Sequence, residues 1–172
     1  MLYVSHHPEE VARLADHMVL LENGRVRAAG PAARLMTRLD LPLARFDAAS
    51  SFLNGVVAGH DDIFHLTHID MQGTRFTVPR EDLELGRRAR VQVYARDVSL
   101  SLSAHDDTSI LNILPVQVLD TRELDPARLM VRLGLDDGQT LLARITRRSG
   151  VALGLHQGMT LYAQVKSVAL VG

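Results

Sequence analysis

Three short polar segments towards the end of the chain hold the residues that are best suited to chemistry. They are TSILN at 108–112, ITRRSG at 145–150 and the pair Lys166-Ser167. Each places hydroxyl groups beside backbone N–H groups at an expected turn or strand end, and none contains a carboxylate. A tetrahedral dianion needs such a set, because many short donors must surround it and one or two cations must offset its charge. Serine and threonine are also ordinary turn residues, and turn statistics alone favour that simpler explanation.

Other reactive residue types lack the partners that their chemistry needs. His6 and His7 are adjacent, so they point to opposite sides of an extended segment, and no third ligand follows at a metal-site spacing. The serines lack the glycine pattern of a nucleophile elbow. The chain also has no GxxxxGK[ST] loop to hold a nucleotide phosphate. We therefore predict no catalytic residues and no directly coordinated metal cation.

Composition limits the class of protein. A chain of 172 residues suggests one or two domains, and 47% hydrophobic residues with only 4% aromatics predict an aliphatic core. The net charge of −1 leaves no basic field for nucleic acid, so we expect no nucleic-acid partner. Cysteine is absent, which fits a reducing compartment. No apolar run approaches about 18 residues, and the first residues lack a basic leader, so a cytoplasmic location is expected.

The first 50 residues are expected to contain short α and β elements. Apolar strands are predicted at 2–5 and 18–21, with a helix between them that Pro8 opens. Asn23-Gly24 predicts a hairpin turn and a returning strand. Residues 31–50 form a connector with a short helix at 32–39, which Leu41-Pro42 ends.

From Ser51 the hydrophobic period changes from 3.6 to 2, which predicts β structure. The predicted strands fall into two sets: 53–59, 63–69, 75–78, 89–94 and 98–102, then 113–121, 127–134, 139–145 and 159–171. Residues 94–100 align with 164–170 at an offset of 70, which indicates an internal repeat. The fold class is therefore mainly β, with two small barrels of the oligonucleotide/oligosaccharide-binding (OB) kind at 51–104 and 105–172.

The N-terminal residues resemble the last elements of an ATP-binding-cassette (ABC) ATPase domain. The stretches LYVSH and LADHMVLLENGRV carry this resemblance. It implies that residues 1–30 are a short α/β remnant of the C-terminal end of that domain. The resemblance makes His6 the switch histidine, which cannot function alone because the phosphate loop is missing. ATP and Mg²⁺ are accordingly expected only in a full-length parent.

The three polar segments resemble the mop, or TOBE, molybdate-binding domain. That family carries a TSxxN segment, an ITxxSGxxLGL segment and a basic residue followed by a small one. By this resemblance the oxyanion-binding residues are Thr108, Ser109, Thr146, Ser149, Lys166 and Ser167. Leu111 departs from the family pattern, which commonly has arginine there. Arg147 or Arg148 could replace that charge.

Together the two resemblances imply the ATP-binding subunit of a molybdate importer. They imply a regulatory unit that binds molybdate or tungstate between two copies of the chain and needs no other cofactor. The full-length parent would associate with a membrane permease at the cytoplasmic face of the inner membrane. Two alternatives stay open: a dimerisation module without ligand, favoured by Leu111, and the regulatory domain of another importer, such as one for sugars. The residues do not discriminate molybdate from tungstate or give the number of ions per dimer.

Overall fold

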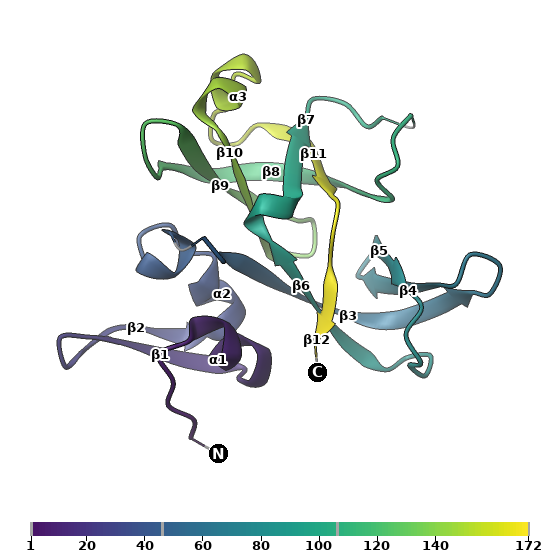
Figure 1. Ribbon diagram of the computed structural model, residues 1–172, viewed down its shortest axis with the longest axis horizontal. Coiled ribbons are helices and arrows are strands. Elements are labelled where there is room, and N and C mark those ends of the chain that lie inside the picture. Colours follow the sequence, from purple (N-terminus) through teal and green to yellow (C-terminus); the bar gives the residue numbers. More distant parts are fainter. Residues whose placement is uncertain (1, 46, 106, 172) are drawn as a thin grey trace.

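The chain folds into two five-stranded antiparallel sheets preceded by a small region of helices and one hairpin (Figure 1). The computed structural model describes residues 2–45, 47–105 and 107–171. The helices are α1 (Pro8–Leu14), α2 (Ala32–Met36) and α3 (Arg147–Ala152), with 3-10 turns η1 (Pro42–Arg45) and η2 (Ala95–Asp97). The strands are β1 (His17–Glu22), β2 (Arg25–Pro31), β3 (Ser50–Asp61), β4 (Leu66–Met71), β5 (Thr74–Pro79), β6 (Arg88–Tyr94), β7 (Val98–Ser101), β8 (Asn112–Glu123), β9 (Arg128–Gly134), β10 (Thr140–Thr146), β11 (Thr160–Val165) and β12 (Ala169–Val171). The prediction of a mainly β chain is confirmed, and no helix within the described ranges is long and apolar enough to cross a membrane.

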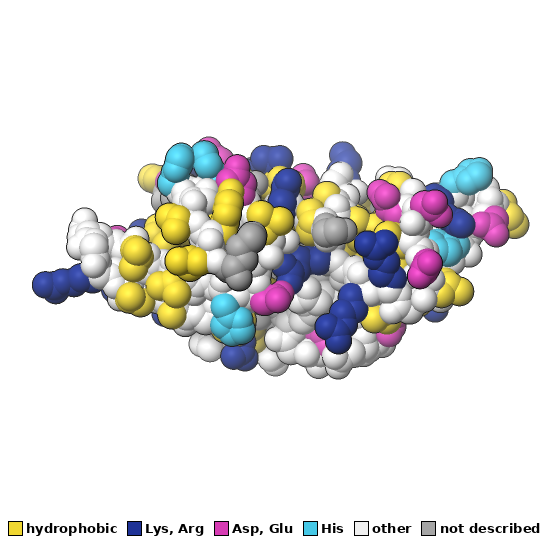
Figure 2. Space-filling model, turned by 90° about the horizontal axis from the view of Figure 1, so that it is seen from below, with side chains coloured by type: hydrophobic (Ala, Val, Ile, Leu, Met, Phe, Trp, Pro, Cys, Tyr) yellow, Lys and Arg dark blue, Asp and Glu magenta, His cyan; other side chains and the backbone are white. Residues whose placement is uncertain are grey.

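The N-terminal region follows the sequence pattern except at its start. Pro8 opens α1, and Asn23 and Gly24 take the positive φ angles, 51° and 74°, that a tight hairpin turn needs. The predicted strand at 2–5 is wrong: these residues run extended without pairing, because no described strand lies beside them. The hairpin keeps an apolar outer face, seen as hydrophobic side chains at the left of Figure 2 and consisting of Val19, Leu21 and Val26.

The two sheets exchange their terminal strands. The first sheet has the order β12-β6-β3-β4-β5 and the second the order β10-β9-β8-β11-β7. β7 follows β6 in the chain but pairs with β11, whereas β12 follows β11 but pairs with β6. Figure 1 shows this crossing as the yellow segment that runs from β11 to β12. Both crossings fall within the repeat at offset 70, so the repeat corresponds to two equivalent strand exchanges.

The exchange also corrects one predicted element. The single strand expected over 159–171 is wrong, because the chain leaves the second sheet after Val165 and joins the first at Ala169. Residues 166–168 are the link between them. The boundary between 104 and 105 stays a prediction, and neither sheet is completed by one set of strands alone.

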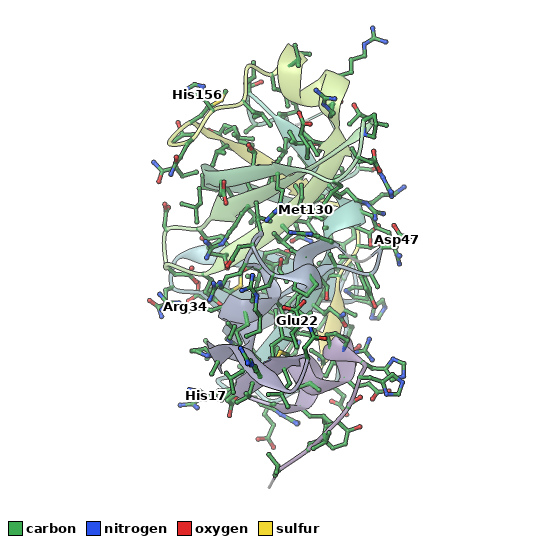
Figure 3. The ribbon with its side chains drawn as sticks, turned by 90° about the vertical axis from the view of Figure 1, so that its left-hand side faces the viewer. His17, Glu22, Arg34, Asp47, Met130 and His156 are labelled. Carbon is green, nitrogen blue, oxygen red and sulfur yellow. The ribbon has the colours of Figure 1, made fainter. Side chains whose placement is uncertain are left out.

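The sheets share one aliphatic core. A single cluster joins side chains of both sheets, among them Leu53, Val91, Leu114, Leu133 and Leu141. The connector packs on the second sheet through a separate cluster around Met130, which Figure 3 places between the second sheet and the N-terminal region. The connector helix is shorter than the predicted 32–39, since α2 ends at Met36. The Thr37 hydroxyl then donates a hydrogen bond to the carbonyl of Arg34.

Gly55 lies in β3 at a close approach to β4, and this gives a stability prediction. A Cβ atom at Gly55 would lie 2.6 Å from the backbone oxygen of Asp70. Relief would require the paired strands to separate, so Gly55→Ala should lower the free energy of unfolding by about 1–3 kcal/mol. Urea unfolding measures this. Gly59→Ala in the same strand is the control, because no atom lies within 4 Å of its added Cβ; equal shifts for both variants would contradict the prediction.

Candidate functional site

The first part of the candidate site is a pair of hydroxyl groups at the start of α3, here called the α3 pair (Thr146 and Ser149). Thr146 is the residue before the helix, and its Oγ1 accepts a hydrogen bond from the Ser149 backbone N–H at 3.0 Å. The two hydroxyl oxygens lie 2.8 Å apart, and both side chains are exposed. This helix was not predicted from the sequence and is only six residues long.

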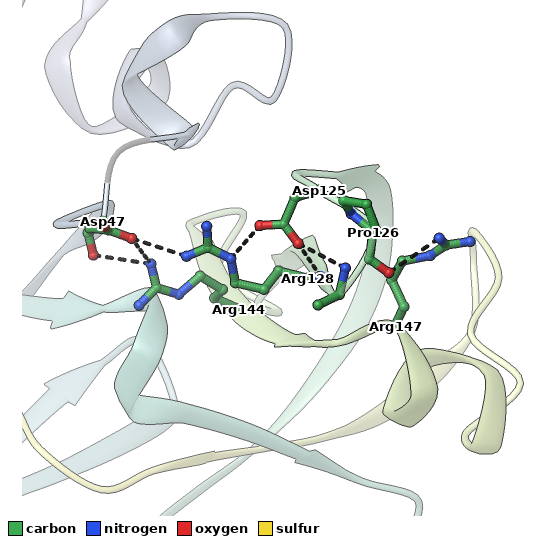
Figure 4. A network of polar contacts seen from close by, with 7 residues as sticks. Asp47, Asp125, Pro126, Arg128, Arg144 and Arg147 are labelled. Atoms are coloured by element: carbon green, nitrogen blue, oxygen red, sulfur yellow. Dashed lines mark hydrogen bonds and ion pairs between the residues drawn. The ribbon is translucent and has the colours of Figure 1, made fainter.

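An ion-pair network supports the strands beneath the α3 pair (Figure 4). Arg128, which faces Thr146 in the β9–β10 ladder, contacts Asp125 at 2.5 Å and Asp47 at 3.2 Å. Asp47 also accepts a hydrogen bond from Arg144 at 2.9 Å. The Arg128 guanidinium holds the pKa of the Asp125 carboxyl below its ordinary value through this hydrogen bond. The network therefore joins the connector to the end of the second sheet that carries α3.

The second part, here called the link group (Thr108, Ser109, Lys166 and Ser167), lies where β8 begins and β11 ends. Asn112 pairs with Val165 in the ladder, so the segments 108–111 and 166–167 leave the sheet from adjacent positions. Lys166 is exposed and is the single lysine of the chain. Its backbone N–H donates to the Asp97 carbonyl at 3.0 Å, which fixes the link to the end of η2. The Thr108 hydroxyl accepts from the Ile110 N–H at 3.2 Å.

The two parts adjoin opposite ends of β8. The link group adjoins Asn112, the first residue of β8, whereas the α3 pair lies beside Arg128, near Glu123 at the other end of β8. The donors therefore divide into two sets that flank opposite ends of this strand.

Asn112 has a structural function that was not predicted from the sequence. Its side-chain amide lies against the edge of β5, where Oδ1 accepts from the Thr77 N–H at 2.7 Å and Nδ2 donates to the Thr77 carbonyl at 2.8 Å. The side chain thus replaces a neighbouring strand and joins the TSILN segment to the first sheet. The only signal in the sequence was the asparagine of the TSxxN motif.

Removing this amide is expected to destabilise the fold. Asn112→Ala leaves the N–H and carbonyl of Thr77 without these partners in a half-buried position, so the free energy of unfolding should fall by about 1–3 kcal/mol. Gln117→Ala is the matched control, because its amide lies on the exposed face of the same strand and makes only a solvent-exposed hydrogen bond, to the Gly158 carbonyl at 3.2 Å. Urea midpoints compare the two. A shift no larger than that of the control would show that the Thr77 contacts contribute little.

The remaining candidates are placed as follows. Leu111, where the mop pattern commonly has arginine, is 66% exposed and directly precedes β8. Arg147 is engaged by Glu123 at 3.0 Å, whereas Arg148 is exposed on α3. The His6 and His7 rings lie 4.1 Å apart on the N-terminal region, and no group of three metal-ligating side chains occurs among the described residues.

Comparison with known proteins gives one domain family and one group of relatives. Residues 108–171 match the TOBE domain model. The chain is 51% identical over 170 residues to the molybdenum import ATP-binding protein ModC of Aromatoleum aromaticum, covering 99% of this chain and 45% of that protein. It is 50% identical over 173 residues to ModC 1 of Azotobacter vinelandii, covering 100% and 48%. The chain thus spans about half the length of the curated relatives it matches.

A solved structure shares the fold. The cytoplasmic molybdate-binding protein ModG, in a crystal form with molybdate bound, superposes with a TM-score of 0.61 over 70% of this chain and 94% of that protein. The sequence identity is 22%, so this similarity concerns the fold alone.

Proposed function

We propose that this chain binds molybdate or tungstate between two copies of itself. The premise is that residues 108–171 match the TOBE domain and that the whole chain is similar to part of molybdenum import ATP-binding proteins. The α3 pair of one copy and the link group of the other form each site. Thr108, Ser109, Thr146, Ser149, Lys166 and Ser167 supply the donors.

The division of the donors into two groups supports this proposal. The groups adjoin opposite ends of β8, and the α3 pair has no cationic side chain of its own. A two-fold symmetric dimer places one end of one chain against the other end of its partner, and it does so twice. Each site then receives hydroxyl groups from one chain and the Lys166 ammonium from the other.

The chemistry of these groups suits a dianion. Hydroxyl and backbone N–H groups donate to the oxyanion oxygens, and the lysine charge makes its hydrogen bond stronger than a neutral one. The six residues include no carboxylate. The site needs no further cofactor, and ATP with Mg²⁺ belongs to the ATPase part of a longer parent.

Regulation of transport follows if the ion prefers one arrangement of the dimer. An ion that binds one arrangement more tightly shifts the equilibrium towards it by the difference in binding free energy. In the parent, which would work with a membrane permease at the cytoplasmic face, abundant molybdate would favour the non-transporting arrangement.

Titration calorimetry tests the proposal directly. Molybdate and tungstate are each expected to give a saturable heat, while sulfate gives a weaker one because its shorter bonds leave some donors out of reach. If a folded dimer gave no saturable heat with molybdate, the proposal that the chain binds this ion would be wrong. The alternative, a dimerisation module without ligand, would then be favoured, with the uncharged Leu111 as its structural basis.

A further inference from the structure

A groove lined by arginines lies on the outer face of the first sheet and includes no residue of the α3 pair or the link group. It has a volume of about 580 Å³, which is within the range of small-molecule sites. Its cationic side chains are Arg13, Arg87, Arg88 and Arg90, and its acidic ones are Asp16 and Asp70. Figure 2, which views the molecule from below, shows Lys and Arg side chains in the middle and right of this face.

The alternation of β6 explains why the arginines gather there. Ala89, Val91 and Val93 point into the core, so Arg88 and Arg90 point outwards on the opposite face. Arg87 precedes the strand, and α1 contributes Arg13 from the other side of the groove. Two elements distant in sequence therefore bring four guanidinium groups to one hollow.

Two of these arginines form a fixed wall. Arg90 donates to Asp16 at 2.8 Å and to Asn54 at 3.1 Å, and so holds the end of α1 against β3. Arg13 donates through Nε to the fully buried Gln92 at 3.2 Å. These contacts use part of the donor set and hold the groove open in one geometry.

The other two arginines are available to a ligand. Arg87 and Arg88 are exposed, and their side chains make no hydrogen bond or ion pair with any described residue. Both carboxylates in the groove are already engaged, Asp16 by Arg90 and Asp70 by the Gly73 N–H at 3.2 Å. Four cations against two anions leave the groove with a charge of +2.

We propose that this groove binds a phosphate-bearing anion of two or more negative charges, with Arg87 and Arg88 as its direct ligands and Arg13 and Arg90 as the wall that positions it. The planar guanidinium fork matches phosphate oxygens in bidentate geometry, which favours this ligand class over a simple halide. The site shares no residue with the proposed molybdate site. Failure of one site therefore does not entail failure of the other.

Calorimetry at low salt with inorganic pyrophosphate tests the groove. Wild type should bind saturably, and Arg87→Ala/Arg88→Ala should bind at least about 10-fold more weakly through loss of two charge-assisted contacts. The control Arg25→Ala/Arg45→Ala removes the same charge from exposed positions outside the groove and should bind as wild type does.

Three outcomes would overturn the proposal. The first is the absence of saturable heat when wild type is titrated with pyrophosphate. The second is an equal loss of pyrophosphate affinity in the groove variant and in the control. The third is loss of pyrophosphate binding in Lys166→Ala, which would locate the anion in the link group. The variant Arg87→Gln/Arg88→Gln keeps polar side chains at both positions and should show the same weakening. Molybdate binding should be unchanged in both groove variants.

Discussion

Lys166→Ala is expected to weaken molybdate binding by about 10- to 100-fold. Lys166 is the single lysine of the chain and the only cationic side chain in the link group, where its exposed ammonium can reach an ion held at the surface. A hydrogen bond to a charged group contributes about 1.5–3 kcal/mol, which corresponds to that range of affinity. Titration calorimetry with molybdate measures it.

The control for this variant is Arg25→Ala, which removes one positive charge from the N-terminal hairpin. Its affinity for molybdate should match that of wild type, because a solvated charge far from the ion is screened. Lysine chemistry gives a second measurement. An amine-reactive reagent should modify Lys166 more slowly when molybdate is present, and modification at the same rate would contradict direct contact.

The strands of this fold could largely be predicted from the sequence, but their partners could not. Alternation after Ser51 gives the faces of each strand, because side chains point to opposite sides in turn. It does not say which strand lies beside which. The exchange of β7 and β12 therefore appears only in the structure, as does the break at 166–168. The predicted strand at 2–5 failed for the same reason, since a strand needs a neighbour.

The candidate residues could be listed from the sequence, but not their grouping. The polar segments and the mop resemblance gave the six residues and a site between two copies, but not which residues act together. The register of β8 places the link group and the α3 pair beside opposite ends of that strand. The α3 helix was missed because six residues are too few to establish a helical period. The contact of Asn112 with Thr77 depends on a neighbouring sheet 35 residues away in sequence, so no local pattern could predict it.

Mixing two defective variants is expected to restore molybdate binding if each site draws on two chains. Ser149→Glu places a carboxylate in the α3 pair, where it would repel the dianion, yet it completes a T-x-x-E capping box with Thr146 that supports the helix. Lys166→Ala damages the link group instead. A mixed dimer holds one site with both defects and one with neither. Random pairing should therefore return about one quarter of all sites to wild-type affinity, read as stoichiometry by calorimetry.

The converse mixture decides between two chains and one. When wild type is paired with the double variant Ser149→Glu/Lys166→Ala, every site of a mixed dimer carries one defect if the groups come from different chains. About one quarter of the sites should then bind, all of them in wild-type homodimers. If each chain formed its own site, about half would bind, and the first mixture would restore none. Ser149→Gln keeps the helix cap without the negative charge, so it should bind molybdate more tightly than Ser149→Glu does. That difference would show that Ser149→Glu loses affinity because its carboxylate repels the ion, and not because α3 is damaged.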